Sequence, residues 1–169
     1  MVETLRLFLF PLLRDQLETY LEGGDKLEKE LGLRSQGRTV SSGVKKMVGL
    51  VTLPKIKSAV KDHYLFYTFW LVVEKSSKSI VAELGFKGPP DRNGGIEIGY
   101  GTMEGQRNKQ FMTEAVAGMI DWAGKRADIQ YILAETDMNN AASIRVVQKN
   151  NFLFEEKKGK MMWWKIRVK

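Results

Sequence analysis

Apolar and polar residues alternate along several short segments of the chain, which is the pattern of strands with one buried face. Other short segments are apolar throughout, as in strands that are buried on both faces. Polar clusters rich in Gly, Ser, Asn and Asp separate these segments and favour turns. Strands are therefore expected at residues 4–10, 65–75, 79–87, 96–101, 131–135, 152–156 and 160–168.

Helical spacing of apolar residues appears between these strands. The clearest stripe follows a polar loop and consists of Phe111, Met112, Ala115, Val116, Met119, Ile120 and Ala123. Such a stripe predicts a helix that packs on a core. Further helices are expected at residues 12–21, from a cap at Asp25 to near Gly32, at 44–61 around Pro54, and from Asn140 onward. Residues 34–43 read as a polar loop, and 87–95 as a long turn.

The composition narrows the function without identifying it. With 169 residues, the chain is expected to form one domain, residues 1–169. It lacks a stretch of roughly 20 apolar residues for a membrane span, and its first residues do not have the pattern of a signal peptide. The absence of cysteine excludes disulfides, thiolate metal sites and an acyl-cysteine intermediate, and is compatible with a cytoplasmic protein. His63 is the only histidine, which argues against a Ser-His-Asp triad and against a histidine-rich metal site.

The net charge of +7 comes from scattered basic residues. This distribution suits solubility and the steering of a polyanionic ligand. Nucleic-acid binding is the alternative, but the chain lacks a recognisable nucleic-acid-binding module, and acidic residues are interspersed in the same segments.

The most informative stretch is the polar loop at residues 104–116, between an expected strand and the long helix. The first N–H groups of a helix have no intrahelical partners, and together with the helix dipole they form a phosphate site. Arg107 and Lys109 add positive charge there, and Asn108 is an N-cap candidate. Basic loops of this kind are common, however, and most of them are only solvated connections.

A second segment supports the functional interpretation of the loop. Residues 139–152, with Asn140 and Ser143, resemble the Asn-x-x-Ser…Lys-x-Gly-Phe signature of the GCN5-related N-acetyltransferase (GNAT) superfamily. Residues 107–115 are similar to its Arg/Gln-x-x-Gly-x-Gly/Ala loop, which is followed by Thr-Glu-Ala. Residues 3–12 resemble the first strand of the subgroup that acetylates ribosomal-protein N-termini (the RimJ/RimL type). By its own chemistry Asn140 is also a plain helix cap, with Ser143 as its polar companion.

The resemblance implies an α/β fold with a mixed, mostly antiparallel sheet of six or seven strands flanked by helices. Two parallel strands, 96–101 and 130–136, would splay apart around the thioester of acetyl-CoA, the cosubstrate. The implied cofactor-binding residues are Arg107, Asn108, Lys109, Gln110, Phe111, Met112, Asn140 and Ser143. The implied acceptor is a primary amine, either a protein N-terminus or a small molecule. A homodimer is left open, and no metal is needed.

Acetyl transfer needs a neutral amine, so a base helps, and the tetrahedral intermediate needs hydrogen-bond donors. Glu97 is the candidate base, acting through water, because on a strand its side chain opposes Ile96 and Ile98. The alternative is that Glu97 is a solvated strand residue and Glu135 is the base. Ser143 would donate to the leaving sulfur or hold the pantetheine arm. Val147 stands where many members of the superfamily have a tyrosine that acts as a general acid.

The chain departs from the superfamily pattern at three positions. Gln110 replaces the key glycine of the loop, where a side chain could crowd the phosphates. Met112 replaces a small residue, and Asn151 replaces a glycine that asparagine can imitate in a left-handed turn. The alternative function is therefore a degenerate member of the superfamily that binds CoA or a partner without acetyl transfer. Residues 24–64, which commonly form the acceptor wall in this superfamily, contain no motif.

Overall fold

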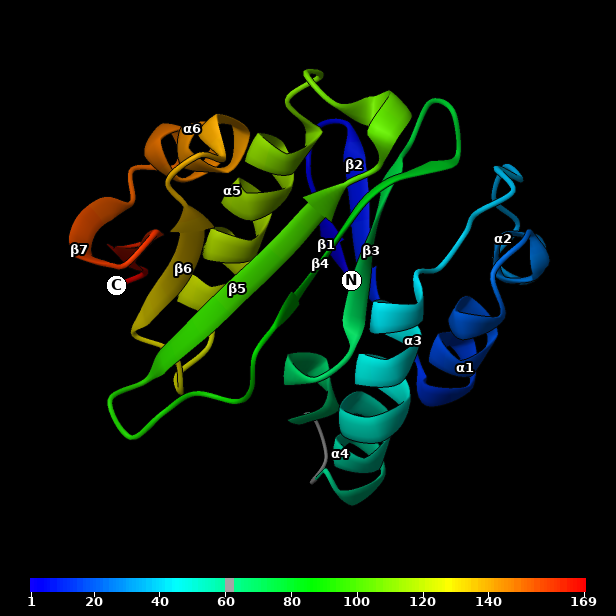
Figure 1. The fold of residues 1–169 in the computed structure, drawn as a ribbon, viewed down its shortest axis with the longest axis horizontal. Helices are drawn as coiled ribbons and strands as arrows, with labels where there is room; N and C mark the ends of the chain where they lie inside the picture. Colours follow the sequence, from blue (N-terminus) through cyan, green and yellow to red (C-terminus); the bar gives the residue numbers. More distant parts are fainter. Residues whose placement is uncertain (60–62) are drawn as a thin grey trace.

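The computed structural model describes residues 1–59 and 63–169, in which eight strands form one sheet (Figure 1). The strand order is β1-β2-β3-β4-β5-β6-β8-β7, and the β5–β6 pair is parallel while the other pairs are antiparallel. The strands are β1 (Val2–Glu3), β2 (Leu7–Pro11), β3 (Phe69–Glu74), β4 (Ser79–Phe86), β5 (Gly95–Thr102), β6 (Tyr131–Asp137), β7 (Leu153–Lys158) and β8 (Met161–Arg167). The mixed, mostly antiparallel sheet expected from the sequence is thus confirmed.

Helices cover both faces of this sheet. They are α1 (Arg14–Glu22), α2 (Lys26–Glu30), α3 (Ser42–Met47), the π-helical turn η1 (Val48–Thr52), α4 (Leu53–Ser58), α5 (Phe111–Gly124) and α6 (Ala141–Lys149). Short 3₁₀ turns lie at η2 (His63–Phe66) and η3 (Glu104–Gln106). Within the described residues, none of the helices has the length and apolar character needed to cross a membrane.

Two apolar cores result from the alternation along the strands. Ile96 and Ile98 of β5 pack with Met119 of α5 on one face of the sheet. Leu17 of α1 and Val48 of η1 belong to the second core. Helices α1 to α4 accordingly gather away from α5 and α6 (Figure 1).

Three expectations about the elements need correction. The sheet has eight strands instead of six or seven, because β1 is a two-residue strand too short to leave a sequence pattern. Strand β3 begins at Phe69 and not at residue 65, because residues 63–66 form the 3₁₀ turn that buries Phe66. The helix expected at 44–61 is found as far as Ser58, with a π-helical turn in its middle, while residues 60 and 61 lie outside the described part of the chain.

Strands β5 and β6 pair only along their first halves. Residues 95–98 of β5 are in register with 131–134 of β6. Beyond this point β5 stays paired with β4, and β6 stays paired with β8. The two parallel strands therefore separate at Gly99, which confirms the expected splay in the sheet.

Candidate functional site

The polar loop before α5 has a left-handed backbone at two non-glycine residues. Asn108 and Gln110 both have φ of 63°, and Gln110 occupies the N-cap position of α5. The expectation that Asn108 caps this helix is therefore wrong, because the helix begins two residues later than expected. No side chain caps α5, so its first-turn N–H groups face the loop without side-chain acceptors. This arrangement suits an anion.

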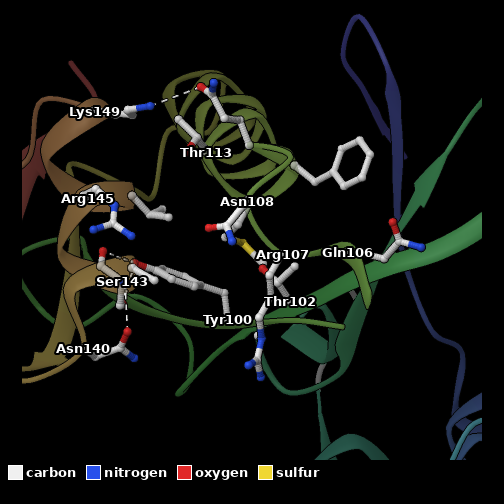
Figure 2. A pocket seen from close by; sticks show the side chains of 16 residues that line it. Tyr100, Thr102, Gln106, Arg107, Asn108, Thr113, Asn140, Ser143, Arg145 and Lys149 are labelled. Carbon is white, nitrogen blue, oxygen red and sulfur yellow. Dashed lines mark hydrogen bonds between the residues drawn. The ribbon is translucent and has the colours of Figure 1, made fainter. Parts of the chain in front are cut away.

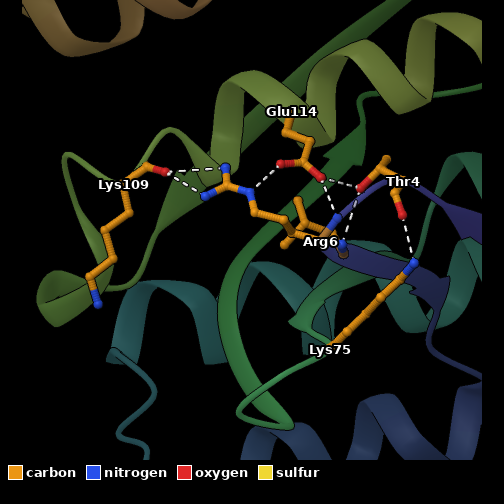
Figure 3. A network of polar contacts seen from close by, with 6 residues as sticks. Thr4, Arg6, Lys75, Lys109 and Glu114 are labelled. Atoms are coloured by element: carbon orange, nitrogen blue, oxygen red, sulfur yellow. Dashed lines mark hydrogen bonds and ion pairs between the residues drawn. The ribbon is translucent and has the colours of Figure 1, made fainter.

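A polar network fastens the loop to the start of the chain (Figure 3). Arg6 donates from Nε to Glu114 of α5 at 2.6 Å, and its Nη atoms donate to the carbonyl oxygen of Lys109 at 3.2 and 3.3 Å. Thr4 Oγ1 also donates to Glu114, at 2.6 Å. Burial alone would raise the pKa of Glu114, but the hydrogen bonds from Thr4 and Arg6 outweigh it and hold this pKa below its usual value.

Helix α6 begins at the other side of the splay. Asn140 accepts a hydrogen bond from the backbone N–H of Ser143 at 3.1 Å, which confirms its role as N-cap. Ser143 Oγ donates to the hydroxyl of Tyr100 on β5 at 3.1 Å (Figure 2). Burial raises the pKa of Tyr100, so its hydroxyl stays protonated at neutral pH. Val147, where a tyrosine stands in many members of the superfamily, is buried in the core.

Loop, strand and helix together enclose a groove of about 630 Å³ (Figure 2). Of the residues expected to bind a cofactor, the groove is lined by Arg107, Asn108, Gln110, Phe111, Met112, Asn140 and Ser143. Lys109 does not line it, and its ammonium group donates to Gln106 Oε1 at 2.8 Å. Sequence reasoning missed Tyr100, Arg145 and Lys149. Arg145 and Lys149 are four residues apart on α6, and this spacing was a usable signal.

The electrostatics of this groove favour an extended anion. Arg107, Arg145 and Lys149 contribute three cations to the lining of the groove. Lys149 Nζ donates to Gln110 Oε1 at 3.2 Å, so the glutamine side chain lies beside this cationic wall. These cations and the uncapped helix start fit the pyrophosphate of a nucleotide-like ligand.

A second cavity, of about 450 Å³, lies on the opposite side of β5. Helices α3 and α4 with the π-helical turn form one wall, which contains Val44, Met47, Val51, Thr52 and Lys55. Strands β3, β4 and β5 form most of the rest of its lining, together with Tyr67 and Thr68 just before β3 and Lys87 just after β4. This cavity shares Tyr100 and Gly101 with the first groove, so the two spaces meet where β5 leaves β6.

Glu97 lies beside the second cavity and does not line it. It is in register with Leu133, within the paired part of β5, and it forms an ion pair with Lys87. Lys87 also donates to Glu135 Oε2 at 3.1 Å. Burial lowers the pKa of Lys87, but the bonds to the two glutamates outweigh burial and raise it overall. Both carboxylates named as base candidates thus share one lysine.

Comparison with known proteins agrees with this geometry. Residues 45–153 match the family described as "Acetyltransferase (GNAT) domain". A Bacillus subtilis (strain 168) protein named "Uncharacterized N-acetyltransferase YjdG" is 35% identical over 95 residues, which are 56% of this chain and 56% of that protein. The chain thus spans little more than half the length of this relative.

Two solved structures resemble the whole fold. One is the acetyl transferase from Salmonella typhimurium that modifies the N-terminal serine of 50S ribosomal subunit protein L7/L12, with 16% identity, a TM-score of 0.66 and coverage of 98% of this chain and 97% of that one. The other is spermidine N-acetyltransferase from Vibrio cholerae in complex with CoA and spermine, with 11% identity, a TM-score of 0.67 and coverage of 98% and 97%. At these identities the likeness establishes the fold alone.

Proposed function

The chain belongs to the acetyltransferase (GNAT) domain family, and we propose that it transfers acetyl directly from acetyl-CoA to a primary amine. The observation that supports this most is the meeting of two cavities at Tyr100 and Gly101. A cationic groove for the donor and an apolar cavity for the acceptor open on the same strand end. Direct transfer in a ternary complex follows, because the chain has no cysteine to hold an acetyl group.

Acetyl-CoA fits the first groove by charge and by shape. Its pyrophosphate would lie on the amides of residues 107–112, with Arg107, Arg145 and Lys149 as counter-charges. Its pantetheine arm would run along Asn140 and Ser143 toward the splay. The thioester then reaches Gly99–Tyr100, where β5 has no backbone partner on the β6 side.

The reaction develops negative charge on the thioester oxygen and on the leaving sulfur. A backbone N–H directed toward the β6 side at the separated end of β5 would stabilise the oxygen. The Tyr100 hydroxyl accepts from Ser143 Oγ and donates to the Ser143 carbonyl oxygen at 3.3 Å, so it would have to exchange this second bond to donate to the sulfur. A thiolate with a pKa near 8.5 leaves readily, so this donor contributes less than the oxyanion contact. Glu97 as base stays a prediction, and it requires the ion pair with Lys87 to open.

The acceptor class follows from the chemistry of the family and agrees with two relatives. One is named for acetylating an N-terminal serine and the other for acetylating spermidine, and both substrates are primary amines. We place the reaction in the cytoplasm, which suits a chain without cysteine. A homodimer stays a prediction.

One observation favours a second function, binding of CoA without transfer. Gln110 stands at the loop position where a glycine is expected, and its side chain is bonded to Lys149 beside the phosphate site. Two measurements separate the possibilities. Calorimetric titration with acetyl-CoA tests binding, and thiol release on a panel of amines tests transfer. Binding with no release on any amine would support the non-catalytic function, and no binding would refute both.

A further inference from the structure

Three glycines of β4 and β5 lie side by side in the lining of the second cavity: Gly85, Gly99 and Gly101. Gly85 of β4 is in register with Gly99 of β5, and Glu83 is in register with Gly101. Residues opposite one another on neighbouring strands project to the same face. A Cβ atom added at Gly99 or Gly101 would meet no heavy atom within 4 Å. Glu83 is therefore the side chain that projects into the cavity from among these glycines, next to the point where the two cavities meet.

A buried support holds the Glu83 carboxylate in place. The hydroxyl of Tyr20 on α1 donates to Glu83 Oε2 at 2.5 Å. The guanidinium of Arg38 lies 4.1 Å from the centre of the Tyr20 ring and donates to the Tyr20 carbonyl oxygen at 2.9 Å. Arg38 is in turn paired with the buried Glu28 at 3.3 Å. Three segments of the chain thus converge behind one carboxylate, while its other oxygen, Oε1, receives no hydrogen bond from the described residues.

The surroundings of Glu83 make it a stronger base than a surface glutamate. Burial raises its pKa, and the Tyr20 hydrogen bond and the Arg38 charge offset only part of this effect. The other cations that line the cavity are Lys55 of α4 and Lys87, which directly follows β4. Lys87 is already engaged with two other glutamates.

The rest of the lining disfavours acceptors that carry several positive charges. Among the described residues that line the cavity, Glu83 is the sole carboxylate, and two are lysines. Most of the others are apolar or aromatic: Val44, Met47, Val51, Tyr67, Phe69, Leu84, Phe86 and Tyr100. A polyamine or an aminoglycoside would bring uncompensated ammonium groups into this space, at a large desolvation cost.

We propose that Glu83 binds the ammonium group of the acceptor and takes its proton, and that the cavity selects an amine with one positive charge on an apolar carrier. Glu83 acts in this way only if acetyl transfer takes place at the site as proposed above. One proton passes from the ammonium to the Glu83 carboxylate, which leaves a neutral amine. The amine nitrogen then forms a bond to the thioester carbon, the carbon–sulfur bond breaks, and its electron pair leaves on the thiolate. The second amine proton passes to solvent or to the thiolate.

The central test compares Glu83→Gln with Glu155→Gln, which changes an exposed carboxylate of β7 outside both cavities. Glu83→Gln should keep its affinity for acetyl-CoA and lose about 10²-fold or more in kcat/KM. Part of this loss should be recovered at high pH, where solvent supplies the neutral amine. Glu155→Gln should behave as wild type. Wild-type turnover in Glu83→Gln would overturn the assignment. If Glu97→Gln then showed the expected loss instead, Glu97 would be the base.

A second variant keeps the test decisive if Glu83→Gln folds poorly. In Tyr20→Phe the carboxylate loses a bond that lowers its pKa, so the acidic limb of the kcat/KM profile should move to higher pH. A merely structural role of Tyr20 would lower activity without moving that limb, and would count against the assignment.

The selection of acceptor is tested on wild-type protein with a peptide that begins with alanine, spermidine and an aminoglycoside. The peptide should be acetylated at least roughly tenfold more efficiently than the polycations, a difference of about 1.4 kcal/mol in transition-state binding. A preference for spermidine or for the aminoglycoside would overturn the selectivity. No turnover of the wild-type protein with any amine would refute the proposed function and, with it, the role of Glu83. Turnover in wild type that Glu83→Gln retains in full would refute the role of Glu83 alone.

Discussion

Gln110 offers the most direct test of the phosphate loop, because its backbone and its side chain can be changed separately. Gln110→Gly and Gln110→Ala both remove the side chain and its bond to Lys149, and they differ only in the Cβ atom. A left-handed conformation costs a non-glycine residue about 1–2 kcal/mol, and Gln110 has φ of 63°. Glycine loses about 0.5–1 kcal/mol through the entropy of the unfolded chain. The glycine variant should therefore be more stable than the alanine variant by about 0.5–1 kcal/mol.

Urea unfolding measures this difference, and thermal unfolding should show it as a shift of roughly 1–4 °C for a chain of this size. Equal stability of the two variants would refute the left-handed backbone at residue 110. Calorimetry with acetyl-CoA then isolates the side chain. Both variants should bind as tightly as wild type or more tightly, because Lys149 is released toward the phosphates. Strong weakening in both variants would mean that the glutamine is a ligand and not an obstruction.

Four other outcomes are expected. Arg107→Ala should weaken acetyl-CoA binding by about 1.5–3 kcal/mol at most, and an unchanged Kd in calorimetry would remove Arg107 from the site. Asn140→Ala should lower the free energy of unfolding by about 1 kcal/mol through loss of the helix cap, measured in urea. The folded-state pKa of Glu114 is depressed, so its stabilisation is present above the usual value of 4.5 and is lost as the pH falls below it. The stability gap between wild type and Glu114→Gln should accordingly narrow from pH 7 to acid, and a constant gap would contradict this. Gly99→Val should fill the second cavity, so turnover should fall while acetyl-CoA affinity, measured as control, stays the same.

Much of the fold could be predicted from the sequence because its elements carry strong periodicity. The stripe on α5 and the alternation on β5 each specify one buried face, and both elements were found, although α5 begins two residues later than expected. The start of β3 was misplaced because a short apolar run has the same composition in a strand and in a 3₁₀ turn. Strand β1 is defined only by its pairing with β2, which is a tertiary contact.

The donor groove could be predicted better than the acceptor cavity, for a physical reason. Phosphate binding depends on a local feature, a helix start with adjacent cations, and such a feature is contiguous in sequence. The acceptor cavity is assembled from helices α3 and α4 and from glycines on two strands. Glu83 and its supports Tyr20 and Arg38 are far apart in the sequence, and only the packing of α1 and of the segment around Arg38 against the sheet brings them together. A position defined by missing side chains, such as Gly99, leaves little signal in a single sequence.

The anchoring of the phosphate loop by Arg6 has a thermodynamic consequence for the start of the chain. Arg6 joins β2 to the loop through Glu114 and the carbonyl of Lys109, so any ligand that orders the loop must also stabilise the docking of the first strands. Linkage is reciprocal, and the gain in affinity from docked strands equals the gain in docking from bound ligand. Hydrogen exchange at the Arg6 amide, which donates to Glu114 at 2.8 Å, should slow when acetyl-CoA is added. Amide exchange in the N-terminal strands should thus depend on whether acetyl-CoA occupies a groove that none of their own residues lines.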